Sequence, residues 1–357
     1  MGFKRGDCCP PDVAPNDAPS DDVVTLKDGL RLTFKPLRIA SDTTEAYERL
    51  KRVAKALAVH AKSSGRSVDD IAASYAGWLC KDEALNRIFP TLFGSGGLVE
   101  KVEQVLKSGS HTRLRKIWTS LVVGLDLFGD EVGFPYCPFT HSRFRAIVSF
   151  FRHTNPRFGI RVHAGENVPR PTSAVAGFSE QEGTAAKVIG QAYELHVRIL
   201  MASISDLAKD AQLPLRIGHG VVFAADTSGL SDGFVAAMES FRNLLKDGPI
   251  PCELNPTSNR MLLLDSHAAP DRRNIRTLSK FLSLGLPVVL CTDDDGVWPI
   301  PACGVHRRHR SVAYEYCHAI LHGEITDVDK LKRMFRDTMA SRFVLAKSKG
   351  DNNGTSE

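Results

Sequence analysis

The sequence lacks the features that mark several classes of protein. It has no apolar run near the roughly 18 residues of a membrane-spanning helix. Its Asp- and Pro-containing N-terminus has no apolar signal-peptide core. Its eight cysteines form no Cys-x-x-Cys pair, so no disulfide framework is indicated. We therefore expect a cytoplasmic protein whose cysteines are reduced and mostly buried.

A strong charge of one sign is also absent. The chain has 46 Lys and Arg against 41 Asp and Glu, a formal net charge of +5 over 357 residues. Proteins that bind nucleic acid concentrate basic residues in a stripe, whereas the densest basic run here, HRRHR (306–310), is short. Nucleic acids and membranes are therefore not the partners that we expect. A composition that is 43% hydrophobic is ordinary for a globular protein.

The first third of the chain differs in pattern from the rest. Residues 1–22 are rich in Pro, Asp and Ala, and we expect them, like residues 350–357, to form a disordered tail. Two alternating runs on either side of an Asp-Gly pair at 28–29 predict a β-hairpin. Helical periodicity follows, including a helix expected over 98–106, so residues 23–118 are predicted to be a mainly helical N-terminal region.

Beyond residue 118 the pattern is that of parallel β/α units. Five short apolar runs each end in Gly, Asp, His or Asn, and helical patterns such as 183–209 and 272–283 lie between them. The runs lie in segments 120–131, 158–167, 213–220, 250–259 and 286–296. Apolar strands alternating with helices predict a parallel sheet covered by helices on both faces. The polar clusters fall at the carboxyl ends of the predicted strands, where such folds build their sites.

Three of these strand ends carry residues that could perform chemistry. His163 and Glu166 follow the second run, His219 the third, and Asp293 and Asp294 the fifth. Taken alone, a histidine at a strand end is usually a structural residue, and adjacent aspartates usually form a solvated loop. One parallel sheet would bring all of them together, however. Imidazole and carboxylate form a zinc-type ligand set, and a spare Glu and His could supply acid–base chemistry.

Five motifs occur in an order that resembles the adenosine deaminase family of zinc hydrolases. They are GLDLFGDE (124–131), VHAGE (162–166), RIGHG (216–220), NPTSN (255–259) and TDD (292–294). The resemblance covers about residues 119–346. It implies a (β/α)8 barrel, with residues 119–349 as the barrel portion and Zn²⁺ at the carboxyl face of the strands.

The resemblance also implies roles for individual residues. His163 and Asp293 would be zinc ligands. Glu166 would protonate the purine N1 while water attacks C6, and His219 would orient or deprotonate that water. Asp294 would hold the water and hydrogen-bond to the purine base.

The implied partner is a small purine nucleoside or nucleotide. The backbone at Gly129 would approach the substrate, and loss of ammonia from C6 would give the 6-oxo purine. The motif at 255–259 looks more like that of nucleoside deaminases than that of AMP deaminases. Arg170 and the basic run 306–310 are compatible with a phosphorylated substrate, so that alternative stays open.

The chain also departs from the family pattern. The family's first strand ordinarily ends in a His-x-His pair of zinc ligands, but no two of the twelve histidines here are separated by a single residue. We therefore expect a barrel that is incomplete or divergent in its N-terminal half, binds zinc substoichiometrically and turns over slowly. His60 and His111 could substitute as ligands.

Two alternatives remain open from the sequence. The chain could be an inactive fragment or a non-catalytic deaminase-like subunit for assembly or ligand sensing, because two zinc ligands are missing. The long segment between His163 and His219, with a Pro-rich loop over 167–177, could serve homo-oligomer formation or pack on the flank of the barrel.

Overall fold

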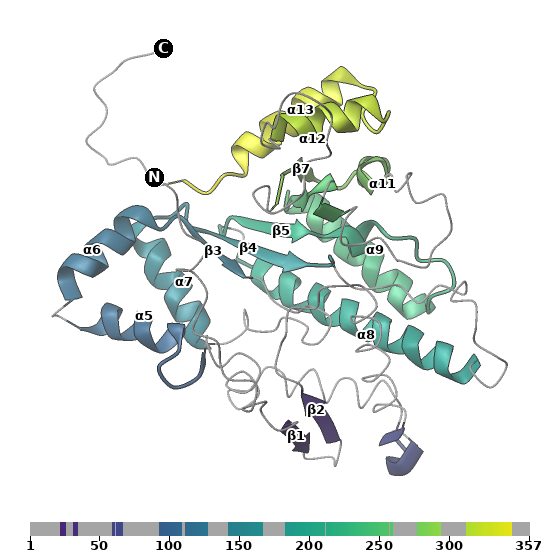
Figure 1. The fold of residues 1–357 in the computed structure, drawn as a ribbon, viewed down its shortest axis with the longest axis horizontal. Coiled ribbons are helices and arrows are strands. Elements are labelled where there is room, and N and C mark those ends of the chain that lie inside the picture. The colour runs from purple at the N-terminus through teal and green to yellow at the C-terminus, as the bar shows by residue number, and fades with distance from the viewer. Residues whose placement is uncertain are drawn as a thin grey trace, which may run out of the picture.

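A parallel β-sheet forms the centre of the protein in the computed structural model (Figure 1). The structure describes residues 22–25, 31–34, 59–60, 62–66, 93–108, 111–127, 142–166, 183–210, 212–256, 258–259, 277–293 and 312–344. The sheet has five strands in the order β3-β4-β5-β6-β7. They are β3 (Gly124–Leu127), β4 (Gly159–Ala164), β5 (Leu215–His219), β6 (Cys252–Leu254) and β7 (Val288–Leu290).

Every neighbouring pair in this sheet is parallel, and each strand lies within one of the five predicted segments. Helices connect the strands: α7 (Ser142–Thr154), α8 (Gly183–Ala208), α9 (Asp232–Asp247) and α11 (Thr277–Ser283). A short 3-10 helix, η4 (Val221–Ala224), follows β5. The predicted parallel α/β arrangement is therefore confirmed over the described residues.

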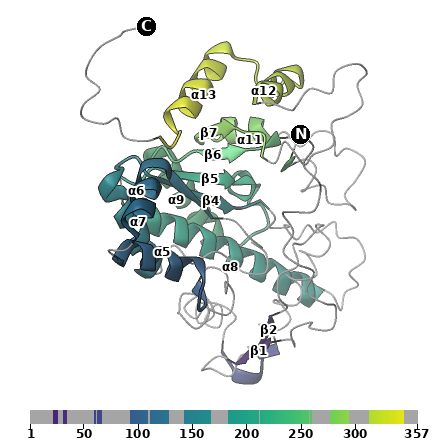
Figure 2. The same cartoon turned by 60° about the vertical axis from the view of Figure 1, so that its left-hand side comes forward.

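Two helices follow the last strand. α12 (Val312–Leu321) and α13 (Val328–Ala340) lie beside the edge strand β7, whereas α7 lies near β3, the opposite edge strand (Figures 1 and 2). None of the helices that the structure describes combines the length and the apolar character needed to cross a membrane.

The sequence explains where these helices start and what they bury. Ser231 caps α9, because its hydroxyl accepts a hydrogen bond from the backbone N–H of Phe234 at 3.3 Å. Phe234, Met238, Phe241 and Leu245 are spaced by three or four residues and form the buried stripe of the helix. This periodic stripe, which packs into the hydrophobic core, sets the position of α9 on the sheet.

The N-terminal region is described only in pieces. Strands β1 (Asp22–Thr25) and β2 (Arg31–Phe34) pair antiparallel, which confirms the predicted hairpin. Helix α5 (Leu98–Lys107) confirms the helix expected over 98–106, and α6 (Thr112–Leu121) follows it. Of the expected tail at 1–22, Asp22 belongs to β1, so the tail was predicted one residue too long. Residues 1–21 and 350–357 and most of the other predicted N-terminal helices lie outside the described residues.

The described cysteines agree only in part with the expectation of buried thiols. Cys252, Cys291 and Cys317 are all free, but only Cys252 is fully buried and Cys317 is exposed. Cys317 lies on α12, whose outer face is turned to solvent rather than to the sheet.

The two faces of the sheet have different chemistry. Side chains alternate along a strand, and Ile160 and Val162 on one face of β4 are fully buried in the hydrophobic core together with residues of the helices. Arg161 and His163 point to the opposite face, where Asp126 of β3 lies directly across from Arg161 in register. The sheet is therefore apolar towards its described helices and charged on the other face, which carries the candidate site. The helices predicted for both faces are found on one of them in the described chain.

The chain after α13 packs beneath the amino end of the sheet. The Phe343 ring lies against Gly159 of β4 so closely that a Cβ there would overlap it, and a Cβ at Gly124 would come within 2.6 Å. The guanidinium of Arg216 lies 4.6 Å from the centre of the same ring. Asn155 donates a hydrogen bond to the carbonyl of Val344 at 3.2 Å. These contacts fix the C-terminal segment under β3 and β4.

Replacing Gly159 by Ala should therefore lower the free energy of unfolding by about 1–3 kcal/mol, the range for overpacked sites. In the Phe343→Ala background the added methyl group has room, so G159A should lower the free energy of unfolding much less there. Urea unfolding of the four proteins of this double-mutant cycle measures the coupling. An equal cost of G159A in both backgrounds would contradict the contact.

Candidate metal centre

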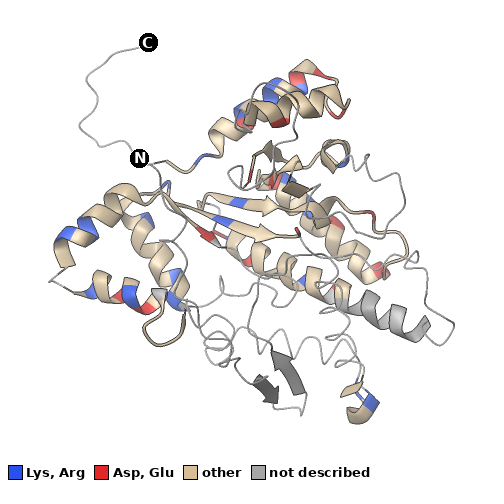
Figure 3. Ribbon diagram, viewed as in Figure 1, with Lys and Arg blue, Asp and Glu red and all other residues tan. Residues whose placement is uncertain are grey.

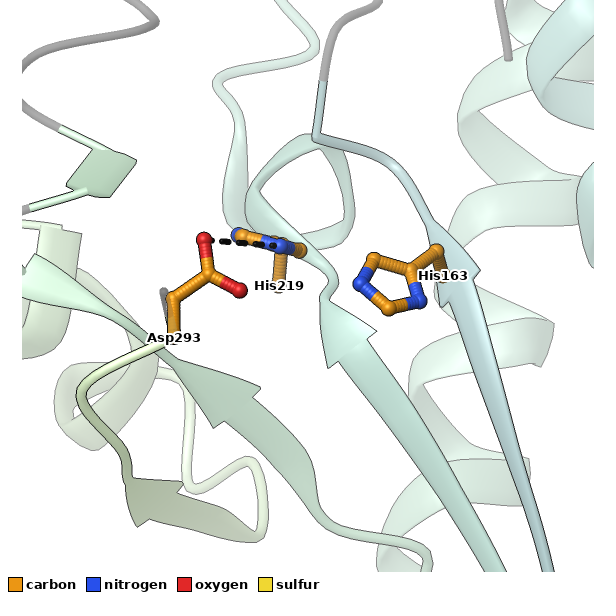
Figure 4. Close-up of side chains that lie close together, drawn as sticks. All are labelled: His163, His219 and Asp293. Atoms are coloured by element: carbon orange, nitrogen blue, oxygen red, sulfur yellow. Dashed lines mark ion pairs between the residues drawn. The ribbon is translucent and has the colours of Figure 1, made fainter. Parts of the chain in front are cut away.

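Three side chains that can ligate a metal meet at the carboxyl ends of the strands. His163 lies near the end of β4, His219 is the last residue of β5, and Asp293 follows β7 (Figure 4). One donor atom from each lies within 4.8 Å of the donors of the other two. In the part of the chain that the structure describes, no other group of three His, Cys, Asp or Glu side chains comes together in this way.

An unusual backbone conformation turns His219 into this site. His219 lies opposite Ala164 in register, so regular alternation would direct its side chain towards the helices. The φ of His219 is 64°, outside the range of a β-strand, so its side chain does not follow the alternation of β5. Asp293 also has a positive φ, of 58°. They are the two non-glycine residues with positive φ in the described chain. Such a conformation costs about 1–3 kcal/mol and is typical of functional sites.

His219 is buried, with 1% of its side chain exposed, and its ring is held from several sides. Its Nδ1–H donates to the Asn259 Oδ1 at 2.7 Å, and Glu166 Oε1 lies 3.3 Å from the same nitrogen. Its Nε2 lies 3.9 Å from Asp293 Oδ2. Burial lowers the pKa of His219 to about 4. The ring is therefore neutral at pH 7, with the Nε2 lone pair on the side of Asp293.

His163 is oriented by two charged neighbours. Its Nδ1 lies 3.1 Å from Asp126 Oδ1, so that Nδ1–H can donate and Nε2 is left as the basic nitrogen. Arg161 Nη1 lies 3.1 Å from Nδ1 and 2.9 Å from Nε2. An atom so close to both nitrogens cannot lie in the ring plane without overlapping Cε1. The guanidinium therefore lies over the ring face and leaves the in-plane lone pair of Nε2 accessible.

Asp126 stays ionised in this arrangement. Burial opposes its ionisation, but the hydrogen bond from His163 and the positive charge of Arg161 outweigh that effect and hold its pKa below the usual value. A carboxylate that accepts from a ligand histidine is a common partner of metal sites, because it fixes the tautomer and the orientation of the ring.

Arg161 connects the site to the middle of the sheet. It reaches across β5 and forms ion pairs with Glu253 of β6 and, at 2.9 Å, with Asp126 of β3. A Cβ at Gly218 would lie 3.2 Å from its guanidinium carbon, so a glycine at this point of β5 lets the side chain pass. Glu253 also lies 3.6 Å from Arg216. The result is a chain of paired charges beneath the candidate metal donors.

The two carboxylates of the site are also positioned. Ser258 donates a hydrogen bond to Asp293 Oδ2 at 2.6 Å. Glu166 has 12% of its side chain exposed and lies beside His219. The geometry thus combines two imidazoles and a carboxylate, which could hold a metal ion, with a second carboxyl group in position to transfer protons.

The sequence-predicted residues have different outcomes. The structure brings together His163, His219 and Asp293, with Glu166 beside them. It places His219 among the possible metal donors, whereas the resemblance implies that His219 acts at the water.

Other predicted residues do not contribute to the observed group. Gly129 and Asp294 lie outside the described residues. His60 and His111 are both described, and neither joins the donor group; His111 is exposed at the start of α6. They therefore do not replace the missing pair of histidines.

Several supporting residues were missed by the sequence analysis. They are Asp126, Arg161, Glu253, Ser258 and Asn259. A signal for three of them was present, since Asp126, Arg161 and Glu253 are charged residues within short apolar strands. A charge in such a strand needs a partner on the same face, which points to the network.

Comparisons of the chain with protein-family models, with curated proteins and with solved structures gave no match in any of the three.

The paired charges should contribute unequally to stability. Glu253→Gln removes the more deeply buried of the two acidic partners of Arg161 and should lower the free energy of unfolding by about 3 kcal/mol, the range for breaking a buried ion pair. Asp126→Asn, at a carboxylate with 47% of its side chain exposed, should cost less than about 1 kcal/mol. Chemical denaturation of both variants checks the order, and a larger cost for D126N would contradict it.

Proposed function

We propose that this chain is a metal-dependent hydrolase that removes the 6-amino group of a purine nucleoside or nucleotide as ammonia. The observation that carries the proposal is the meeting of two histidines and an aspartate, His163, His219 and Asp293, with Glu166 beside them. Metal donors next to a carboxyl group in a nearly buried position are the components of metal-assisted hydrolysis.

The donor set suits zinc. Catalytic zinc sites commonly use three protein ligands drawn from His, Asp and Glu and leave a fourth position open. His163 and His219 each have one ring nitrogen taken up by a hydrogen bond to an oxygen, Asp126 Oδ1 or Asn259 Oδ1, which leaves Nε2 for a metal. When bound, zinc supplies a Lewis acid and lowers the pKa of water to about 7.

The chain's own residues supply orientation and proton transfer. Glu166 lies beside His219, with its Oε1 3.3 Å from Nδ1 of that ring, and it is nearly buried and not itself in the donor group. It would hand a proton to the ring nitrogen of the purine as water adds at the neighbouring carbon. Ser258 keeps Asp293 in place through its hydrogen bond, so the carboxylate does not rotate away from His219.

The purine substrate rests on the order of the five motifs. The resemblance to the adenosine deaminase family suggests that Glu166 transfers the proton and that His219 acts at the attacking water. It also suggests that the five-stranded sheet is part of a (β/α)8 barrel and that Gly129 and Asp294 contact the base. The parallel strand order β3 to β7 supports this assignment.

A non-catalytic role is the second candidate. In its favour, the sequence has no His-x-His pair, and neither His60 nor His111 joins the donor group among the described residues. A metal held without that pair could serve ligand sensing or assembly. The two functions differ in whether ammonia is released.

Zinc content and ammonia release test the proposal together. Purified protein supplied with zinc should bind one ion per chain, lose part of it on dialysis, and release ammonia from adenosine, deoxyadenosine or AMP. His163→Ala should abolish both properties, because it removes a metal donor. His153→Ala, which alters an exposed histidine of α7, is the matched control and should change neither. Unchanged zinc binding by H163A would refute the site, and zinc without ammonia would favour the non-catalytic role.

Glu166→Gln should separate proton transfer from metal binding. The substitution keeps the shape of the side chain but removes its acidic proton, so turnover should fall by about 10²- to 10⁴-fold. Zinc content should stay as in the unaltered protein. Glu239→Gln, at an exposed carboxylate of α9, should leave both unchanged. Normal turnover by E166Q would remove Glu166 from the mechanism.

A further inference from the structure

A cleft lies at the opposite end of the strands from the metal centre. It has a volume of about 800 Å³ and is bounded by the turns that lead into β4, β5, β6 and β7 and by α13. The metal donors follow the carboxyl ends of the strands, whereas this cleft lies at their amino ends. A volume of this size is typical of sites for small molecules.

The cleft is lined by five cationic side chains and a single carboxylate. The cations come from three parts of the chain: the turn before β4, the last turn of α9, and α13 with the residues after it. Figure 3 colours the basic positions along the ribbon blue, and several lie on α13. They are Arg157, Lys246, Lys330, Arg333 and Arg342, and the carboxylate is Asp337.

Several other cations in the described chain have an acidic partner. Arg143, Arg145, Arg152, Arg161 and Arg242 each form an ion pair with a carboxylate. None of the five cations of the cleft does so with any residue that the structure describes. Like charges gathered in one concave place raise the local potential and attract an anion.

The floor of the cleft is apolar and has few backbone N–H or C=O groups available to a ligand. Prolines stand at the entrances of the strands and have no N–H to donate. The carbonyls of Pro214, Pro251 and Pro287 already accept hydrogen bonds from the neighbouring strands. Met334 of α13 and Phe343 complete the apolar lining. Recognition in this cleft must therefore combine cationic side chains with apolar contact.

We propose that this cleft binds a phosphorylated small molecule with a flat ring, such as a nucleotide. The cations would hold the phosphates, since arginine presents several donors in a geometry that matches phosphate oxygens. The apolar floor would contact the ring. This site lies apart from the metal centre and does not depend on the proposed deamination.

Binding of GTP to the full chain tests this site. GTP has no 6-amino group and so differs from the proposed deamination substrates. Calorimetry should show one GTP per chain, with an affinity that falls as salt is raised. Inorganic tripolyphosphate should bind more weakly, because it has no ring to contact the apolar floor.

Variants locate the binding. R333A/R342A should weaken GTP binding by roughly tenfold or more, because two charge-assisted contacts are lost. K332A/R336A changes two cations of the same helix that do not line the cleft and should leave the affinity unchanged. His219→Ala at the metal centre should also leave it unchanged.

The contrary outcomes are distinct. No GTP binding at millimolar concentration, or the same affinity in R333A/R342A as in the unaltered chain, would overturn the site. Loss of binding in H219A would place the nucleotide at the metal centre. Equal affinity for tripolyphosphate and GTP would overturn the proposed organic ligand.

Discussion

The parallel pairing of β4 with β5 is the constraint on which the rest of the site depends. It places Ala164 opposite His219 and so brings the ends of both strands to the same edge of the sheet. The rings of His163 and of His219, whose backbone is in the left-handed conformation, then lie with their centres 5.4 Å apart. β6 and β7 extend the same parallel order and bring Asp293 to this edge. Without this register the three donors could not meet.

The charged face of the sheet ties folding and chemistry together. Arg161 spans three strands by pairing with Asp126 and Glu253, and it covers the face of the His163 ring. Buried charges are tolerated only when they are paired, so the same ion pairs that make this face stable also hold a donor histidine in one orientation. The cost of burying them is offset by apolar packing on the opposite face, where Ile160 and Val162 lie in the core.

Much of this arrangement could be predicted from the sequence. Apolar runs that end in polar residues predicted the five strands, and the shared strand ends predicted that His163, His219 and Asp293 would lie close together. Periodicity could not predict the backbone turn at His219, because alternation alone directs that side chain to the other face. Nor could it predict the reach of Arg161 across Gly218, which depends on a partner 92 residues away in the chain. Such contacts are set by tertiary packing rather than by local pattern.

The central claim is that two histidines and an aspartate form one metal centre. X-ray absorption at the zinc edge of the zinc-loaded chain tests it most directly, because the spectrum reports the donor atoms themselves. The account predicts two imidazole nitrogens and oxygen at about 2.0–2.2 Å, with the imidazole signal reduced in the H219A variant. A sulfur shell at about 2.3 Å, or a spectrum of oxygen donors without imidazole, would contradict it.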